Sequence, residues 1–142
     1  MNRLQRLTRD TAGSVAVEFA LLGPLMIGML FGVLQIGIGM KAYNSLRAIA
    51  SDTARYAAVN YQTANRLTNT QLQSYGRAVA IATPYGLRSD RVTVSVTTPT
   101  TQRVTGATEK KITITYKVDT LLKIINVRAV NLTYSRPIFL TT

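Results

Sequence analysis

The sequence predicts an α+β protein in which a long N-terminal helix is followed by a second helix and a small antiparallel sheet of about three strands. Residues 19–40 form one run without a charged side chain, which predicts a continuous apolar helix. Over residues 43–61 and again over 71–83, apolar side chains recur every three or four positions, as they do on one face of a helix. From residue 92 to 140, apolar and polar side chains alternate, which is typical of half-buried strands.

The uncharged run from Phe19 to Met40 has Gln35 as its only polar side chain. A helix rises about 1.5 Å per residue, so this run reaches about 33 Å, enough to cross a hydrocarbon core of about 30 Å. A helix inside a globular domain normally keeps a polar face. A cleaved secretory signal has a shorter apolar region, of about 7–15 residues. We therefore predict that residues 14–40 form a single transmembrane anchor.

The anchor separates two basic segments. The chain has 142 residues, with 17 Lys and Arg against 6 Asp and Glu, and a formal net charge of +11. Residues 1–13 carry +2 and residues 41–142 carry +10. The predicted organisation is thus a basic leader (1–13), an anchor (14–40) and an exported α+β domain (41–142). Because positive residues flank the anchor on both sides, the charge count alone leaves its orientation nearly balanced.

The composition argues against catalysis. The chain has no His and no Cys, which removes the usual general base, the thiol nucleophile and the commonest metal ligands. The carboxylates after the anchor are spaced as single residues in predicted helix or loop positions. They are Asp52, Asp90, Glu109 and Asp119. We therefore expect no enzymatic activity, no cofactor and no metal site.

Two helical segments are predicted after Met40. The first continues the anchor helix to about Tyr61, and its core stripe comprises Tyr43, Leu46, Ala50, Ala54, Ala57 and Tyr61. The second runs from about Gln71 to Thr83, where Pro84 and Gly86 end it. Its inward residues are predicted to be Leu72, Tyr75, Val79 and Ala82.

Three alternating segments predict the strands of the sheet. Their apolar positions are Val92, Val94 and Val96; Ile112, Ile114, Tyr116 and Val118; and Val130, Leu132, Tyr134, Ile138 and Leu140. The polar stretch 99–109 is too long for a tight hairpin and is predicted to be a flexible tip. Pro137 cannot donate to a ladder, so it predicts an edge or the end of the third strand. The apolar residues 121–125 are predicted to cap the core, although they could instead rest on a membrane or a partner.

The positive charges of residues 41–142 are spread along the chain. Nucleic-acid binding needs lysines and arginines gathered on one face with aromatic residues among them. The densest cluster is Arg88 with Arg91, which a hairpin could bring next to Lys110 and Lys111. We therefore do not expect nucleic acid as a partner. A solvated surface near anionic lipid headgroups is the favoured interpretation.

Glu18 is a carboxylate at the start of the apolar run. A charge at the bilayer centre costs about 2.5–3.5 kcal/mol on insertion scales, and less toward the interface. Glu18 therefore either lies in the headgroup layer, where the dipole at a helix start favours it, or has a cationic partner. The residue alone does not distinguish the two.

The residues around Glu18 resemble a known processing site. Residues 9–19 resemble the cleavage site of type IV prepilins, with a short basic leader, Gly13 before the scissile bond, and Glu18 as the fifth residue after it. The pattern Gly-x-x-x-x-Glu-Phe followed by Ala-Leu-Leu-x-Pro is similar to TadE-like pseudopilins, the minor pilins of the tight-adherence (Flp, type IVc) pilus system. Residues 54–59, Ala-Arg-Tyr-Ala-Ala-Val, are similar to that family's helix after the anchor. The resemblance covers about residues 9–60.

The resemblance implies a pilin-like fold and a role in pilus assembly or adhesion. A prepilin peptidase would cut between Gly13 and Ser14 on the cytoplasmic face, and Glu18 with Phe19 would act in recognition and assembly. The implied partners are the membrane, which the chain would cross once, the peptidase, other pilin or pseudopilin subunits and the pilus assembly platform. The implied location is the bacterial inner membrane, with residues 41–142 exported to the periplasm.

Two features inside the anchor bear on helix packing. Gly28 and Gly32 form a small-xxx-small pair that lets helices approach closely in lipid, although glycine is also common in membrane helices generally. Pro24 removes a helix hydrogen bond and predicts a kink.

An alternative function stays open: an uncleaved single-span membrane protein with an exported ligand-binding or sensing domain. The mature N-terminus distinguishes the two.

Overall fold

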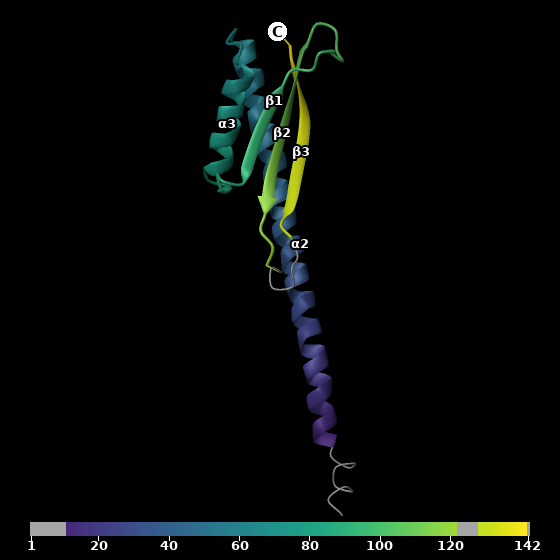
Figure 1. Ribbon diagram of the computed structural model, residues 1–142. Helices are drawn as coiled ribbons and strands as arrows, with labels where there is room; N and C mark the ends of the chain where they lie inside the picture. The colour runs from purple at the N-terminus through teal and green to yellow at the C-terminus, as the bar shows by residue number, and fades with distance from the viewer. Residues whose placement is uncertain (1–10, 122–127, 142) are drawn as a thin grey trace, which may run out of the picture. The chain divides into compact units, whose positions relative to one another are not determined.

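The computed structural model describes residues 11–121 and 128–141 (Figure 1). The elements in chain order are α2 (Thr11–Gln62), α3 (Asn69–Ile81), β1 (Val92–Thr97), β2 (Thr108–Val118) and β3 (Val130–Leu140). Two helices and a three-stranded antiparallel sheet confirm the predicted α+β class. The chain divides into two compact units, unit 1 (Met1–Ile36) and unit 2 (Gly37–Thr142).

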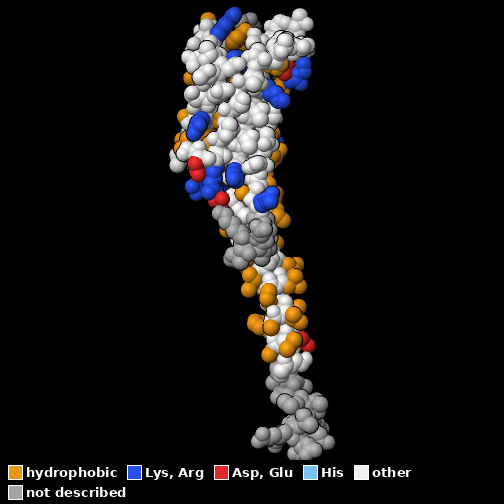
Figure 2. Space-filling view, in the orientation of Figure 1, with side chains coloured by type: hydrophobic (Ala, Val, Ile, Leu, Met, Phe, Trp, Pro, Cys, Tyr) orange, Lys and Arg blue, Asp and Glu red, His pale blue; other side chains and the backbone are white. Residues whose placement is uncertain are grey.

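Unit 1 is the apolar first part of α2. Its large apolar side chains are exposed on all sides of the helix; they include Val15, Phe19, Leu22, Met26, Leu30 and Val33 (Figure 2). The helix assignment continues through Pro24 without a break. By length and composition, Gly13–Gln62 contains a segment that is able to cross a membrane. Such a surface is costly in water and favourable in lipid, which fits the predicted anchor.

Unit 2 packs the second part of α2 and α3 against a sheet (Figure 1). The core draws residues from both helices and all three strands, including Leu46, Ile49, Leu72, Val96, Ile112, Ile114 and Ile138. Thr53 is fully buried within this core, and its hydroxyl donates to the Ile49 carbonyl at 2.8 Å. No buried polar side chain among the described residues lacks a hydrogen-bond partner.

The predicted stripe on α2 is only partly correct. Leu46, Ala50, Ala54 and Ala57 are buried as predicted, but Tyr43 is 39% exposed. Tyr43 packs edge-to-face on Tyr134, with ring centroids 5.9 Å apart, instead of entering the core. Ile49 and Thr53 were not in the predicted stripe, yet both are fully buried. The buried face is wider than one stripe because α3 and the sheet both pack against α2.

Helix α3 begins with a capping box. The Thr68 hydroxyl accepts from the backbone N–H of Gln71, and the Gln71 side chain accepts from the backbone N–H of Thr68. This box places the helix start two residues before the predicted one. The prediction that Ala82 faces inward is wrong, because Ala82 is the C-cap, with extended backbone, and is exposed. The inward residues of α3 are Leu72, Gly76 and Ala80, with Tyr75 and Val79 half-buried.

The sheet has the order β1-β2-β3, and both pairs are antiparallel. β2 begins at Thr108, so the loop after β1 is shorter than the predicted tip and Glu109 belongs to a strand. Pro137 lies in the edge strand β3, opposite Lys111, as predicted. Val130, at the start of β3, is 50% exposed and does not join the core. Of the predicted apolar turn, Leu121 is exposed and residues 122–125 lie outside the described residues.

The predicted proximity of the two basic pairs is wrong. Lys111 lies opposite Thr97, at the end of β1, while the Arg91 carbonyl, at the start of β1, accepts from the backbone N–H of Lys117. The antiparallel register therefore places Lys110 and Lys111 at the opposite end of the sheet from Arg88 and Arg91. No continuous basic surface joins these four residues.

Candidate functional surfaces

The residues that the sequence singled out lie on α2 in unit 1. Ser14 and Glu18 are four residues apart and so share one helix face, while Phe19 is 77% exposed beside them. Glu18 is exposed, and no ion pair or hydrogen bond joins it to another described residue. A carboxylate on an exposed helix face is available to a cation of another molecule.

The glycines of the anchor leave the helix backbone open. A β-carbon built on Gly28 or Gly32 would meet nothing within 4 Å, and the same holds for Gly13. Gly28 and Gly32 are one helical turn apart and therefore lie on the same face. Another helix is able to approach the backbone closely along this face.

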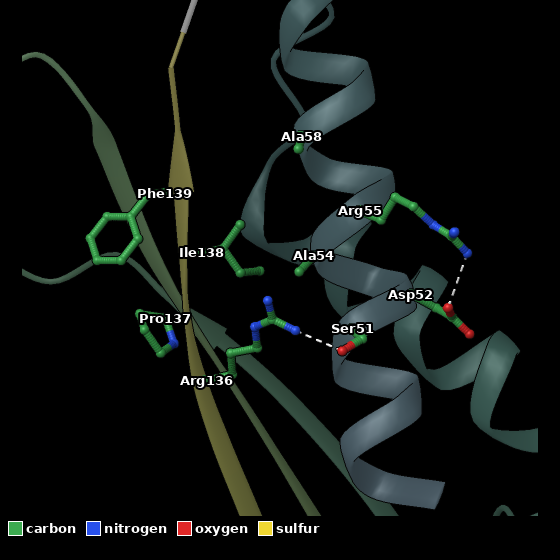
Figure 3. Close-up of a pocket in the computed structure, with 9 residues that line it drawn as sticks. All are labelled: Ser51, Asp52, Ala54, Arg55, Ala58, Arg136, Pro137, Ile138 and Phe139. Carbon is green, nitrogen blue, oxygen red and sulfur yellow. Dashed lines mark hydrogen bonds and ion pairs between the residues drawn. The ribbon is translucent and has the colours of Figure 1, made fainter.

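Unit 2 has a groove of about 530 Å³ between α2 and the edge strand β3. Its lining residues are Ser51, Asp52, Ala54, Arg55, Ala58, Arg136, Pro137, Ile138 and Phe139 (Figure 3). Arg136 reaches across from β3 and donates from Nη1 to Ser51 Oγ at 2.6 Å. Ile138 points toward α2, whereas Pro137 and Phe139 point away from it (Figure 3). The groove thus has a small apolar floor, with the Arg136 guanidinium at the β3 side and the paired Asp52 and Arg55 also among its lining residues.

Asp52 is directed to the other side of α2 from this guanidinium (Figure 3). Its Oδ1 pairs with Nη2 of Arg55, three residues further along the helix, at 3.3 Å. Its Oδ2 accepts a hydrogen bond from the Tyr85 hydroxyl at 2.8 Å, and this bond is the main cause that raises the pKa of Tyr85. Asp52 therefore ties α2 to the turn after α3.

A buried carboxylate holds the loop between β1 and β2. Glu109 is 3% exposed and receives hydrogen bonds from the backbone N–H and the guanidinium of Arg103, while its own N–H donates to the Gln102 side chain. Arg103 lies over the Phe139 ring at 5.3 Å. The hydrogen bonds that Glu109 accepts from Arg103, chiefly those from the guanidinium, lower the pKa of Glu109. Glu109 is therefore not the loop carboxylate that its spacing predicts, because the strand β2 extends back to Thr108 and includes it.

A second charged group lies at the other end of the strands. Arg88 donates twice to Asp90, at 3.2 and 3.1 Å, which is the main cause that lowers the pKa of Asp90. Arg91 pairs with both Asp90 and Asp119. The prediction that these two carboxylates are isolated is therefore wrong, because the sheet register brings them to one arginine. Both are salt-bridged and partly exposed, which suits stabilisation of the strand ends.

Within residues 11–121 and 128–141, no group of three or more His, Cys, Asp or Glu side chains is placed to hold a metal ion. The ion pairs described above each join a carboxylate to an arginine.

Residues 13–55 match the model of one protein family, TadE (TadE-like protein). The match begins at Gly13, runs through the apolar part of α2 and ends inside unit 2. It confirms, over these residues, the resemblance to TadE-like pseudopilins. No curated protein and no solved structure matches the chain.

Proposed function

We propose that this chain is a pilin-like minor subunit, a pseudopilin, that is needed for assembly or function of a tight-adherence type IV pilus. The observation that carries the proposal is the match to the TadE-like family over residues 13–55, which starts at the glycine before the proposed cleavage site. The exposed apolar surface of unit 1 supports membrane anchoring by one helix.

The proposed processing step is cleavage between Gly13 and Ser14 by a prepilin peptidase. Cleavage removes three arginines with the leader and gives Ser14 a new α-amino group. Glu18 would pair with that amino group on a neighbouring subunit. Opposite charges about 4 Å apart attract by about 4 kcal/mol at an effective dielectric constant near 20, which exceeds the cost of placing a lone carboxylate in the bilayer.

The proposed location follows from this processing. The leader lies on the cytoplasmic side of the inner membrane, residues 14–40 cross it, and residues 41–142 face the periplasm and enter the cell-surface pilus or its base. The partners are the peptidase, other pilin or pseudopilin subunits and the assembly platform. Gly28 and Gly32 provide the face for helix packing, and Pro24 provides a bend near the start of the anchor.

The mature N-terminus tests the proposal. The protein extracted from its native membrane should have the intact mass and terminal sequence of a chain that starts at Ser14. The variant Gly13→Leu should stay at full length, whereas Gly23→Leu should be cleaved normally. The pair is matched because an added β-carbon meets nothing within 4 Å at either glycine, so a difference reports recognition rather than folding.

An intact Met1 in the native membrane would contradict cleavage and favour the alternative, an uncleaved single-span protein with a ligand-binding or sensing domain. A chain that starts near Ser51 would contradict the anchor itself, because the apolar helix would then have been removed.

A further inference from the structure

The two edges of the sheet in unit 2 are not equivalent. On the β1 edge, α3 supplies hydrogen-bonding side chains: Gln73 Nε2 donates to the Val96 carbonyl at 3.3 Å, and Asn69 Nδ2 donates to Thr98 Oγ1 at 3.1 Å. Helix α3 lies beside β1 (Figure 1), and a helix that covers an edge strand keeps another strand from pairing there. The β1 edge is therefore covered by the chain itself.

The register shows which backbone groups of β3 face outward. The backbone N–H of Lys117 donates to the Arg91 carbonyl, so the odd-numbered residues of β2 form the hydrogen-bonded pairs with β1. In an antiparallel ladder, the backbone groups of successive residues point to opposite sides. The even-numbered residues of β2 therefore bond to β3, where they pair with even-numbered residues such as Arg136, opposite Ile112. The odd-numbered residues of β3 direct their N–H and C=O groups away from the sheet.

Pro137 has an odd number, so it lies where an N–H would point outward. A proline at such a position keeps the ladder with β2 intact and removes one donor from the free edge. The outward donors and acceptors of Asn131, Thr133 and Ser135 are not affected. The free edge thus offers an uninterrupted stretch for pairing over residues 131–135.

The charge on the edge strand is positive, and Asp52, the carboxylate that lines the neighbouring groove, is already paired with Arg55 and Tyr85. β3 contains no Asp or Glu, and its one charged residue is Arg136. The Arg136 side chain lies on the α2 side of the strand, beside the groove (Figure 3). Lys111, opposite Pro137, is exposed. An added strand would form a close, non-hydrogen-bonded pair opposite Arg136, with Cα atoms about 4.5 Å apart. A carboxylate at that place would meet the guanidinium directly.

We infer that the β3 edge is a binding site for an extended segment of another protein, which adds to the sheet as a fourth strand and places an acidic side chain against Arg136 at the mouth of the groove. Backbone pairing with residues 131–135 provides the affinity, and the guanidinium with the small apolar floor of Ala54, Ala58 and Ile138 provides the selectivity. The inference concerns unit 2 alone and does not depend on the proposed function.

Charge excludes a second copy of this chain as the favoured occupant. Residues 41–142 carry +10, and two β3 strands side by side would bring two positive edges together without a carboxylate between them. Like charges at an interface lower affinity and disfavour that pairing. An acidic partner segment is instead attracted to the positive edge, because its carboxylate compensates the charge of Arg136.

Binding of a defined peptide to the full chain in lipid nanodiscs tests the site. The probe is a short fluorescein-labelled peptide of alternating Thr and Val with one central Glu, and fluorescence anisotropy gives its affinity. The same peptide with Lys in place of Glu should bind at least about tenfold more weakly. A third version, N-methylated at alternate residues, keeps the charge but cannot pair along the edge and should not bind.

Three test variants and one control variant separate charge, hydrogen bonding and edge pairing. Arg136→Gln should lower the affinity for the Glu peptide about tenfold, whereas Arg77→Gln, which removes the same charge from α3, should change it less than about twofold. Ser51→Ala removes the hydrogen bond to Arg136 without a change of charge and should leave binding intact. Thr133→Pro should abolish binding, because it removes an outward donor and keeps the ladder to β2.

The inference is overturned if the N-methylated peptide binds as well as the parent, since strand addition is then absent. It is also overturned if Arg136→Gln and Arg77→Gln weaken binding equally, since only diffuse charge then acts. A disulfide that joins two copies of the Ser135→Cys variant would assign the edge to a second copy of this chain and would overturn it as well.

Discussion

Gly76 of α3 lies so close to Thr53 of α2 that a β-carbon on Gly76 would come within 3.1 Å of Thr53 Oγ1. The same β-carbon would be 3.2 Å from Val94 Cγ1 on β1. Thr53 Oγ1 cannot rotate away without losing its hydrogen bond to the Ile49 carbonyl. The two helices and the first strand therefore meet at a point that has no room for a side chain.

The Gly76→Ala variant should lower the free energy of unfolding by about 1–3 kcal/mol, because an overpacked core shifts its neighbours. This loss opposes the gain of up to about 1 kcal/mol that alanine brings to a helix interior. Urea unfolding followed by circular dichroism in detergent micelles measures the change. Ser74→Ala, at an exposed position of the same helix, is the control for propensity. An increase in stability for Gly76→Ala would contradict this account of the contact.

Leu46 of α2 is one of the fully buried residues in the core of unit 2. It is fully buried, so Leu46→Ala should cost about 2–5 kcal/mol in the free energy of unfolding. Leu25→Ala is the matched change in unit 1, where the leucine is 59% exposed, and it should leave the unfolding of unit 2 unchanged. Equal effects of the two variants would mean that unit 2 is not a separate core.

Glu109 should make unit 2 sensitive to acid. Its pKa in the folded chain lies below the ordinary value of 4.5, chiefly because Arg103 donates to it. A carboxylate whose pKa is lower in the folded chain than in the unfolded chain stabilises the fold at pH values above the unfolded-state pKa. This contribution disappears as the pH falls through the folded-state pKa. Glu109→Gln should therefore reduce stability at neutral pH, and its difference from the parent chain should shrink as the pH falls below about 4.5.

Unfolding curves over a pH series measure this difference. Asp90→Asn is the control, because Asp90 also has a lowered pKa but its side chain is 57% exposed and its pairing with Arg88 is screened by water. Its effect should be the smaller of the two. A constant difference between Glu109→Gln and the parent chain at every pH would contradict the role of ionised Glu109.

Glu18 should decide association within the membrane. Glu18→Ala should lose the charge pair with the N-terminus of a neighbouring subunit, whereas Glu18→Asp keeps a carboxylate and should retain part of the association. Crosslinking of membranes from cells that produce each variant, followed by mass determination of the products, measures the association. Unchanged crosslinking for Glu18→Ala would exclude the pairing role and favour the carboxylate in the headgroup layer.

The periodic parts of the fold could be predicted from the sequence. Alternation over β1, β2 and β3 predicted which residues share a face, and of the two alternatives that Pro137 predicted, an edge or a strand end, the structure shows the edge. The family match over residues 13–55 agrees with the residues around Gly13 and Glu18 that predicted it. These features are local, because each depends on spacing within one segment.

The features that were missed depend on contacts between distant segments. Tyr43 fits a helical stripe, yet it is 39% exposed and packs edge-to-face on Tyr134 of β3 instead of entering the core. The pairing of Arg91 with Asp119, and the bond from Arg136 to Ser51, follow from strand register and from the packing of β3 beside α2. Neither is visible in residue spacing, and the groove therefore could not be predicted.

The unequal edges of the sheet have a consequence for stoichiometry. With α3 beside β1, the sheet of this chain has one open edge, that of β3. Each copy of the chain therefore offers one position to a partner segment and no second one. Assembly through this edge is finite, in contrast to the unlimited stacking that a sheet with two open edges allows.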